Sequence, residues 1–205
     1  MSKSALIVID IQNDFLPGGA LGVAGGFDVI EPINKLMGRF DLVVATQDWH
    51  PSDHASFASN HAGREPGEVI EVEGLTQVLW PDHCVQDTPG AEFAEGLDTA
   101  RIERVFRKGS DARYDSYSGF YDNGHHSATG MTEYLREQGV EQVFLVGIAT
   151  DYCVKFSALD ACADGFDTTV IIDACRGVIV SPGDIEKAVA EMTQAGAKMA
   201  AAGSF

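Results

Sequence analysis

The chain has 205 residues, is 45% hydrophobic and carries a formal net charge of −17 at pH 7. This length and apolar content suit one large core, so we expect a single domain over residues 1–205. With 31 acidic against 14 basic residues, no basic surface is available to replace phosphate counterions, which argues against nucleic-acid binding. Residues 1–15 lack the layout of a signal peptide or a membrane span. We therefore expect a cytoplasmic protein that binds neither nucleic acid nor membranes.

Short apolar runs alternate with helical patterns along the chain. Runs rich in valine and isoleucine, typical of strands buried on both faces, lie at 5–11, 42–47, 102–106, 142–148 and 168–172. Apolar residues recur at helical spacing over 29–37, 131–135, 154–161 and 184–196. The tail 195–205 is either a last small strand or a frayed end. This alternation predicts an α/β fold with a doubly wound, mainly parallel sheet flanked by helices.

Residues 51–89 interrupt this alternation. The segment contains three histidines and Trp80, and His50 stands directly before it. We interpret it as a long excursion from the carboxyl end of the second strand, inserted within the same domain. Loops of this length in compact domains are usually functional or disordered, and the aromatic and histidine residues favour function.

Reactive side chains stand at or just beyond the ends of four predicted strands. They are Asp10 in the first run, Asp48 and His50 after the second, Lys108 after the third and Cys153 after the fourth. Ligand sites in open α/β sheets form beyond the carboxyl ends of the strands. We therefore expect these residues to converge on one edge of the sheet.

Cys153 is the candidate nucleophile. It follows Gly147 and Ala149, which permit a tight turn, and Asp151, which is expected to cap the next helix. Exposed N–H groups in the first turn of that helix would favour a thiolate and could hold an oxyanion. The remaining cysteines are read as free core thiols of a reducing compartment: Cys84, Cys162 and Cys175.

Asp10 lies within an apolar run, where an unpaired carboxylate would be costly, and Lys108 is its candidate partner. Such a pair either fixes two strands or takes part in catalysis. Together with Cys153, the two residues provide a nucleophile, a proton carrier and a cation. This set is sufficient for acyl transfer from an amide.

A metal site is predicted from Asp48 and His50, whose side chains leave the same face of an extended segment. His83 can add a third ligand from the excursion. Two histidines and one carboxylate, with further positions open, suit Zn²⁺, Mn²⁺ or Fe²⁺. His54 is either a fourth ligand or a partner of the ligands. The other histidines are expected at the surface: His61, His125 and His126.

These residues stand in blocks that resemble the nicotinamidases of the isochorismatase-like cysteine hydrolases. The blocks are VIDIQNDF at 8–15, TQDWHP at 46–51, LWPDHCV at 79–85, RKG at 107–109 and GIATDYCV at 147–154. The first and fourth are shared across the wider superfamily, whereas the metal blocks and the sequence around Cys153 are more specific. The resemblance implies an amidohydrolase that converts nicotinamide to nicotinate and ammonia in NAD salvage, and that also accepts pyrazinamide.

The resemblance also implies roles for residues. The triad would be Asp10, Lys108 and Cys153, and one divalent metal, zinc before manganese or iron, would bind the pyridine nitrogen of the substrate. Its implied ligands are Asp48, His50 and His83. A cis peptide between Ile148 and Ala149 is implied, with the N–H groups of Ala149 and Cys153 as the oxyanion hole. The implied aromatic walls are Phe15, Trp80 and Tyr152, and Trp49 is either a further wall or a core residue.

Three other interpretations stay open. A metal-bound hydroxide could perform the chemistry and leave Cys153 incidental. The same cysteine machinery could act on another small amide, such as a carbamoyl or ureido compound, although relatives of that kind generally lack the metal. The chain could also be a non-catalytic metal-binding or interaction module. The implied partner is a small molecule, and a homo-oligomer is compatible with the sequence.

Overall fold

The computed structural model describes residues 3–205, so Met1 and Ser2 of the predicted domain lie outside the described residues. Six strands form one parallel sheet in the order β5-β2-β1-β6-β7-β8. They are β1 (Lys3–Ile9), β2 (Leu42–Asp48), β5 (Arg104–Lys108), β6 (Val140–Ile148), β7 (Asp167–Arg176) and β8 (Lys198–Ala200). The five predicted strands are confirmed with shifted ends: β1 stops before Asp10, and β5 continues to Lys108. Of the two alternatives for the tail, a last small strand or a frayed end, the structure has a strand, β8.

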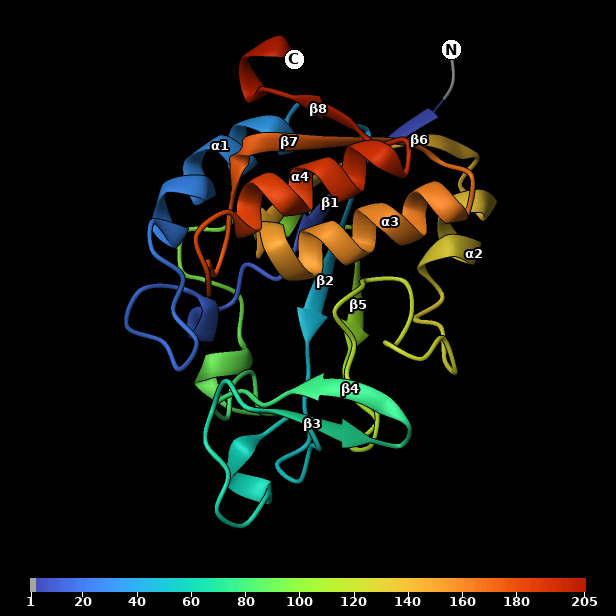
Figure 1. Cartoon of the computed structure of the whole chain (residues 1–205). Coiled ribbons are helices and arrows are strands. Elements are labelled where there is room, and N and C mark those ends of the chain that lie inside the picture. The colour runs from blue at the N-terminus through green and yellow to red at the C-terminus, as the bar shows by residue number, and fades with distance from the viewer. Residues whose placement is uncertain (1–2) are drawn as a thin grey trace.

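Helices cover both faces of the sheet, as the burial of β1 and β2 on both sides requires. On one face α1 (Ile30–Met37) packs its Ile33 and Leu36 against Leu6 of β1. On the other face lie α2 (Met131–Glu137), α3 (Lys155–Ala163) and α4 (Asp184–Gln194). Figure 1 shows α3 and α4 side by side in front of the strands. The predicted doubly wound α/β fold is confirmed.

The strand order reverses between β1 and β6. From β1 the chain adds β2 and β5 on one side of the sheet, whereas β6 is followed by β7 and β8 on the other side. In open α/β sheets, ligands bind beyond the carboxyl ends of the strands at such a reversal. Asp10 directly follows β1 and Cys153 lies just beyond β6, so the topology itself brings these two residues to one crevice.

The 51–89 excursion contains an antiparallel hairpin that the sequence did not predict. Its strands are β3 (Val69–Val72) and β4 (Leu75–Val78), and in Figure 1 they lie beyond the carboxyl ends of β2 and β5. Glu73 and Gly74 form the two-residue turn, and both have positive φ angles, 49° and 80°. Hairpin turns of this kind usually use Asn, Asp or Gly at both positions, so the Glu73-Gly74 pair is a weak signal.

Among residues 3–205, none of the helices has both the length and the apolar character that crossing a membrane requires.

Candidate active site

Lys108 lies at the centre of a buried cluster of charges at the carboxyl edge of the sheet. Its Nζ is 2.9 Å from Asp10 Oδ2, 2.6 Å from Asp48 Oδ1 and 3.6 Å from Cys153 Sγ. The same ammonium donates to the carbonyl oxygen of Ser116 at 2.9 Å. The three residues of the predicted triad therefore meet, and Asp48, predicted only as a metal ligand, joins the same cluster.

Asp10 is aimed at Lys108 by its backbone and by Thr46. With a φ of 47° it leaves the extended conformation directly after β1. The hydroxyl of Thr46 donates to Asp10 Oδ1 at 2.6 Å, and the Asp10 N–H donates to the same hydroxyl at 3.2 Å. Complete burial raises the pKa of Asp10, the Lys108 ammonium opposes this, and the nearby Asp48 carboxylate raises it further. The carboxylate is thus a better proton acceptor than an ordinary aspartate.

Burial and the neighbouring charges both affect the protonation of Cys153. Burial raises the pKa of its thiol well above the usual value; Lys108 opposes this rise, while Asp10 and Asp48 add to it. For Lys108, burial disfavours the charge, but Asp10 and Asp48 outweigh it and hold the pKa of the ammonium well above its ordinary value. The expectation that the helix start would by itself favour a thiolate is therefore wrong. The thiol keeps its proton until a base removes it.

Cys153 lies in a single π-helical turn, Thr150–Val154, that precedes α3. The N–H groups of Tyr152 and Val154 both donate to the carbonyl oxygen of Ala149, at 3.1 and 3.0 Å. The peptide bond between Ile148 and Ala149 is cis, as the family resemblance implied. A side chain at Gly147, whose φ is 125°, would place its Cβ 2.1 Å from the Ile9 carbonyl oxygen. Only glycine allows β6 to approach β1 this closely next to the turn.

Asp151 does not cap α3, contrary to expectation. Its carboxylate instead accepts hydrogen bonds from the N–H groups of Val178 and Ile179, at 2.9 and 2.8 Å. The capping pattern could not reveal this, because the partners lie beyond β7 in the sequence. Asp151 therefore fixes the loop that carries Val178 beside Cys153.

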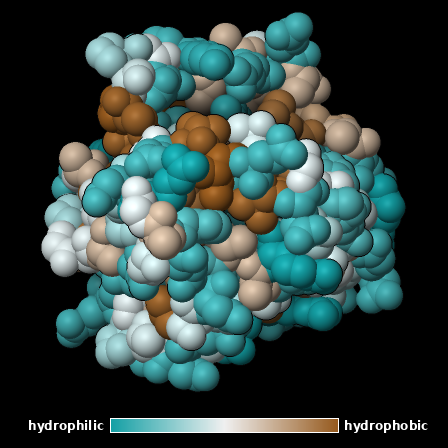
Figure 2. Space-filling view, turned by 60° about the horizontal axis from the view of Figure 1, so that its bottom comes forward, coloured by the Kyte–Doolittle hydropathy of each residue, from teal (hydrophilic) through white to brown (hydrophobic). Residues whose placement is uncertain are grey.

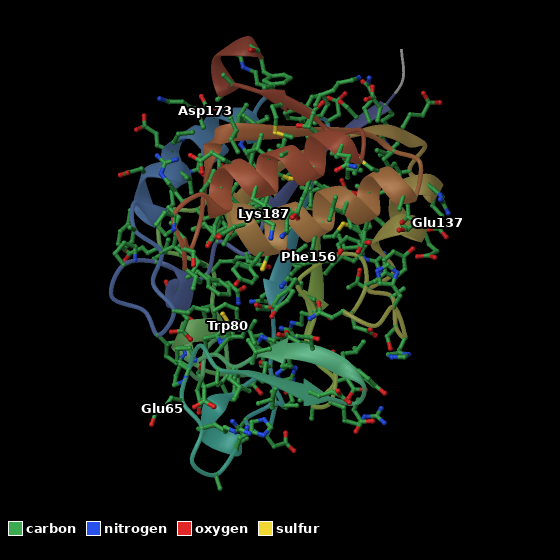
Figure 3. The ribbon with its side chains drawn as sticks, in the orientation of Figure 1. Glu65, Trp80, Glu137, Phe156, Asp173 and Lys187 are labelled. Atoms are coloured by element: carbon green, nitrogen blue, oxygen red, sulfur yellow. The ribbon has the colours of Figure 1, made fainter. Side chains whose placement is uncertain are left out.

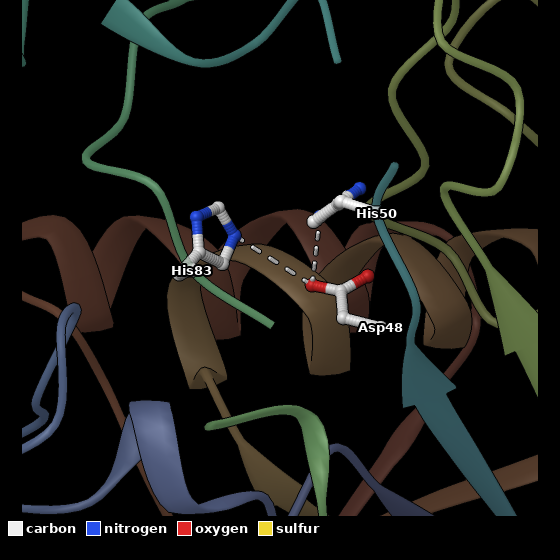
Figure 4. Close-up of side chains that lie close together, drawn as sticks. All are labelled: Asp48, His50 and His83. Atoms are coloured by element: carbon white, nitrogen blue, oxygen red, sulfur yellow. Dashed lines mark ion pairs between the residues drawn. The ribbon is translucent and has the colours of Figure 1, made fainter. Parts of the chain in front are cut away.

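The predicted metal ligands converge on one oxygen. Asp48 Oδ2 lies 3.5 Å from His50 Nε2 and 3.9 Å from His83 Nε2, as Figure 4 shows. The three donor atoms lie within 4.8 Å of one another, and all three residues are buried. Burial raises the pKa of Asp48, but Lys108 and His50 lower it more, so the carboxylate is charged.

The second nitrogen of each ring is held by a backbone carbonyl. His50 Nδ1 is 2.9 Å from the oxygen of Gly109, and His83 Nδ1 is 2.8 Å from the oxygen of Pro81. These contacts assign the proton to Nδ1 and leave Nε2 as a ligand atom. Among residues 3–205, His50 Nε2 has no hydrogen-bond partner. A buried, unpartnered nitrogen beside a carboxylate fits a divalent metal ion.

His54 lies next to this cluster. Its ring centroid is 4.2 Å from that of His50, and its Nδ1 is 2.7 Å from the hydroxyl of Ser56. The other nitrogen is buried without a partner in the described part of the chain, and it forms a second possible ligand group with His50 and Asp115. Burial and the neighbouring His50 together lower the pKa of His54 to about 4. Both predicted roles of His54, ligand or partner of a ligand, stay open.

A narrow cavity connects Cys153 with the ligand cluster. Its walls include all three predicted aromatic residues, Phe15, Trp80 and Tyr152. Figure 3 shows Trp80 between the sheet and the hairpin of the excursion. The walls that the sequence did not indicate are Leu21, Asp115, Tyr117 and Val178. Figure 2 shows this side of the molecule as mainly hydrophilic, with hydrophobic residues in several separate spots, the largest near the middle.

Tyr117 could not be found from the sequence because it lies in an irregular segment between β5 and α2. Its hydroxyl accepts a hydrogen bond from Trp80 Nε1 at 3.3 Å, and its ring contacts that of Tyr152. Trp49 does not line this cavity; the guanidinium of Arg107 lies 3.8 Å from its ring centroid. Of the two interpretations of Trp49, packing is the one that holds.

The remaining histidines lie away from the site. His125 and His126 are exposed as predicted, and His125 lies 3.3 Å from Asp160. His61 is only partly exposed, because its ring contacts the Ala55 carbonyl oxygen at 2.8 Å.

The sheet is doubly wound, and a buried Asp-Lys-Cys cluster lies where its strand order reverses. This arrangement is that expected of an amidohydrolase. Residues 4–203 match the isochorismatase domain, so the chain belongs to the isochorismatase family. It is 47% identical to a nicotinamidase of Acinetobacter baylyi, over 95% of this chain and 91% of the relative.

Two solved structures share the fold over nearly the whole chain. The nicotinamidase/pyrazinamidase of Acinetobacter baumannii superposes with a TM-score of 0.96 and 48% identity, covering 100% of this chain and 98% of that one. A pyrazinamidase of Pyrococcus horikoshii, solved in complex with zinc, has a TM-score of 0.79 and 37% identity, with 97% and 99% covered. The resemblance predicted from the sequence is confirmed.

Proposed function

We propose that the protein is a nicotinamidase, an amidohydrolase that converts nicotinamide to nicotinate and ammonia. The similarity to nicotinamidases over nearly the full length of both chains supports this activity. One observation carries the chemistry: the single ammonium of Lys108 joins the Asp10–Cys153 pair to the ligand cluster through Asp48. A nucleophile and a binding site for a ring nitrogen thus share one cavity.

In the proposed first half-reaction, Asp10 accepts the thiol proton as the Cys153 sulfur attacks the carboxamide carbon. The N–H groups of Ala149 and Cys153 hold the negative oxygen of the tetrahedral intermediate. The carbon–nitrogen bond then breaks, and Asp10 returns its proton to the leaving nitrogen, which departs as ammonia. A thioester between nicotinate and Cys153 is left.

In the second half-reaction, a water molecule attacks the thioester. Asp10 accepts one proton from this water, and the carbon–sulfur bond breaks to release nicotinic acid, whose remaining proton passes to ammonia or solvent and leaves nicotinate. The proton on Asp10 returns to the sulfur, so the resting thiol is restored. Lys108 keeps its charge throughout and stabilises whichever neighbour, Asp10 or Cys153, is negative.

The substrate ring would be oriented from the opposite end of the cavity. Asp48, His50 and His83 would hold a divalent metal, which supplies a Lewis acid for the pyridine nitrogen. We propose zinc, because the Pyrococcus relative was solved with zinc and two histidines with one carboxylate suit it. Phe15, Trp80 and Tyr152 would enclose the ring. Pyrazinamide, which has a ring nitrogen at the same position, should be accepted as well.

We also propose that the chain works as one domain in the cytoplasm. The match of one family domain to residues 4–203 supports the single domain. The four cysteines are free, which suits a reducing compartment.

A coupled ammonia assay tests the function. We expect the protein to release ammonia from nicotinamide, to lose this activity when the metal is stripped and to regain it with zinc. Carbamoyl and ureido compounds serve as competing substrates. Activity on these compounds with none on nicotinamide would overturn the proposal, and activity that ignores metal removal would contradict the role of the metal.

A further inference from the structure

The pairing of β1 with β2 ends before Asp48, next to the reactive residues. β1 and β2 pair in parallel up to Val8 and Ala45, but Asp10 then turns out of the strand with a φ of 47°. β2 continues to Asp48, which pairs with Lys108 of β5 on its other side. The turn that aims the Asp10 carboxylate therefore leaves Asp48 without a neighbouring strand on the β1 side.

Gln12 fills this position with its side chain. Its Nε2 donates to the Asp48 carbonyl oxygen at 2.8 Å, and its Oε1 accepts from the Asp48 N–H at 2.8 Å. The amide thus pairs with both backbone groups of Asp48, as a peptide group of β1 would have done. Nε2 also donates to the Ala91 carbonyl oxygen at 2.8 Å, and the side chain is completely buried.

The backbone of Gln12 is hydrogen-bonded to the backbone of Asp10. Its N–H donates to the Asp10 carbonyl oxygen at 2.9 Å. Gln12 therefore contacts Asp10 through its backbone and Asp48 through its side chain.

We propose that Gln12 is a positioning residue that holds Asp48 in register with Asp10. The expected effect of Gln12 on catalysis rests on the proposed function. Its effect on the position of Asp48 does not. Without the amide, the N–H and carbonyl of Asp48 would be buried and unpaired, and the strand end would move to find partners. The Asp48 carboxylate, which faces both Lys108 and the metal ligands, would then lose its orientation.

No other side chain meets both needs of Asp48. Glutamate could accept the N–H bond, but it cannot donate and would add a negative charge beside Asp48. Asparagine keeps the amide but is one methylene too short to reach. Methionine has a similar volume and neither donor nor acceptor, so Gln12→Met removes the pairing with little change in packing.

Gln47 offers a matched control. It is also a glutamine, is 7% exposed, and its Nε2 donates to the same Ala91 oxygen at 2.9 Å. Its Oε1 accepts from Arg107 at 3.2 Å and makes no hydrogen bond to the Asp48 backbone. Gln47→Met therefore removes the Ala91 contact that the two glutamines share and leaves Asp48 paired.

The experiment measures zinc affinity by competition with a chelator, together with thermal stability, for the parent protein, Gln12→Met and Gln47→Met. Loss of a group that orients a metal ligand typically weakens binding by about 10–100-fold. We expect a weakening of that size for Gln12→Met, and less than about threefold for Gln47→Met. At saturating zinc, kcat with nicotinamide should still be reduced in Gln12→Met, because Asp48 also orients Lys108.

Equal zinc affinity in the two variants would overturn the inference, whatever their stability, because Gln12 would then act only as a core residue. If Gln12→Met does not fold, Gln12→Asn replaces it, with the same two outcomes. If the parent protein binds zinc but does not hydrolyse nicotinamide, the proposed function fails, while the difference in zinc affinity still decides the role of Gln12.

Discussion

The carboxyl edge of the sheet and the 51–89 excursion hold their reactive residues in different ways. At the sheet edge, Asp10, Asp48 and Lys108 directly follow or end three adjacent strands, β1, β2 and β5. Their separation is set by strand register, and each is at most 3% exposed. The backbone ladders of the fold, completed beside Asp48 by the Gln12 side chain, therefore carry the positions of these groups.

The excursion holds its residues through a few individual hydrogen bonds. His83 is fixed by the Pro81 carbonyl, and the next residue, Cys84, donates its N–H to Asp14 Oδ2 at 2.7 Å. The hairpin farther out is half exposed. We propose on this basis that the sheet edge supplies the bond-breaking chemistry and that the excursion helps to orient the substrate through His83 and Trp80.

The largest effect is expected for Cys153→Ala. Loss of the nucleophile should reduce ammonia release from nicotinamide by on the order of 10⁴-fold or more. Zinc content should stay unchanged, because the Cys153 sulfur is not in the predicted ligand set. Ammonia assays and elemental analysis on the same sample test this. Retained turnover would favour a metal-bound hydroxide as the nucleophile.

Lys108→Met should damage both stability and activity. It leaves the carboxylates of Asp10 and Asp48 buried without their cation, which typically costs about 3–5 kcal/mol. Urea denaturation gives the free energy of unfolding. Adding Asp10→Asn to this variant should restore part of the stability, because one of the two buried charges is removed. An unchanged free energy of unfolding in Lys108→Met would contradict the role of Lys108 in stabilising the two carboxylates.

His83→Ala tests the excursion. We expect zinc affinity to fall by more than the roughly 10–100-fold that follows loss of a group orienting a ligand, because His83 would itself be a ligand, with a smaller loss of stability than for Lys108→Met. KM should rise more than kcat falls at saturating zinc, because ring binding is affected and the triad is intact. A kcat loss as large as that of Cys153→Ala would remove the proposed division between the two regions.

His54 should make the metal-free protein sensitive to acid. Its pKa is about 4 in the folded state against an ordinary value of 6.5. Between these values the unfolded chain binds the proton and the folded chain does not, so the free energy of unfolding falls as the pH falls from 6.5 to 4. At pH 5, protonation of His54 in the unfolded chain lowers the free energy of unfolding by roughly 2 kcal/mol. Urea denaturation of the metal-free proteins should show a smaller fall in the free energy of unfolding between pH 7 and pH 5 for His54→Asn than for the parent. An equal fall in the two proteins would contradict this.

The smallest effect is expected for Trp80→Leu. The indole is 7% exposed and borders the cavity, so its loss removes ring contacts worth about 1–1.5 kcal/mol. KM for nicotinamide should rise roughly tenfold with kcat nearly unchanged. Tyr114→Leu is the control, because Tyr114 does not border this cavity. Equal effects in the two variants would exclude Trp80 as a ring contact.

Much of the fold and the site could be predicted from the sequence. The buried strands were visible because a parallel sheet covered on both faces requires unbroken apolar runs. Asp10 stood out because a carboxylate in such a run needs a partner, and strand order then placed Asp10, Lys108 and Cys153 at one edge. The metal ligands Asp48, His50 and His83 were suggested by their residue types, and the family resemblance added the cis peptide.

The sequence could not show contacts between distant segments that leave no periodic pattern. The Lys108–Asp48 pair, the Asp151 contact with the loop at Val178, and Tyr117 as a cavity wall depend on how irregular segments pack. The acidity of Cys153 was misjudged for the same reason: the exposed start of a helix favours a thiolate, but burial next to two carboxylates reverses that preference.

The sequence by itself therefore determined the sheet and the reactive residues that follow its strands, because strand composition and strand ends are local properties. The tertiary structure alone decided which charges face one another, what protonation they favour, and how Gln12 substitutes for a missing strand beside Asp48. Those outcomes depend on distances across the sheet and on the exclusion of water, which only the packed molecule defines.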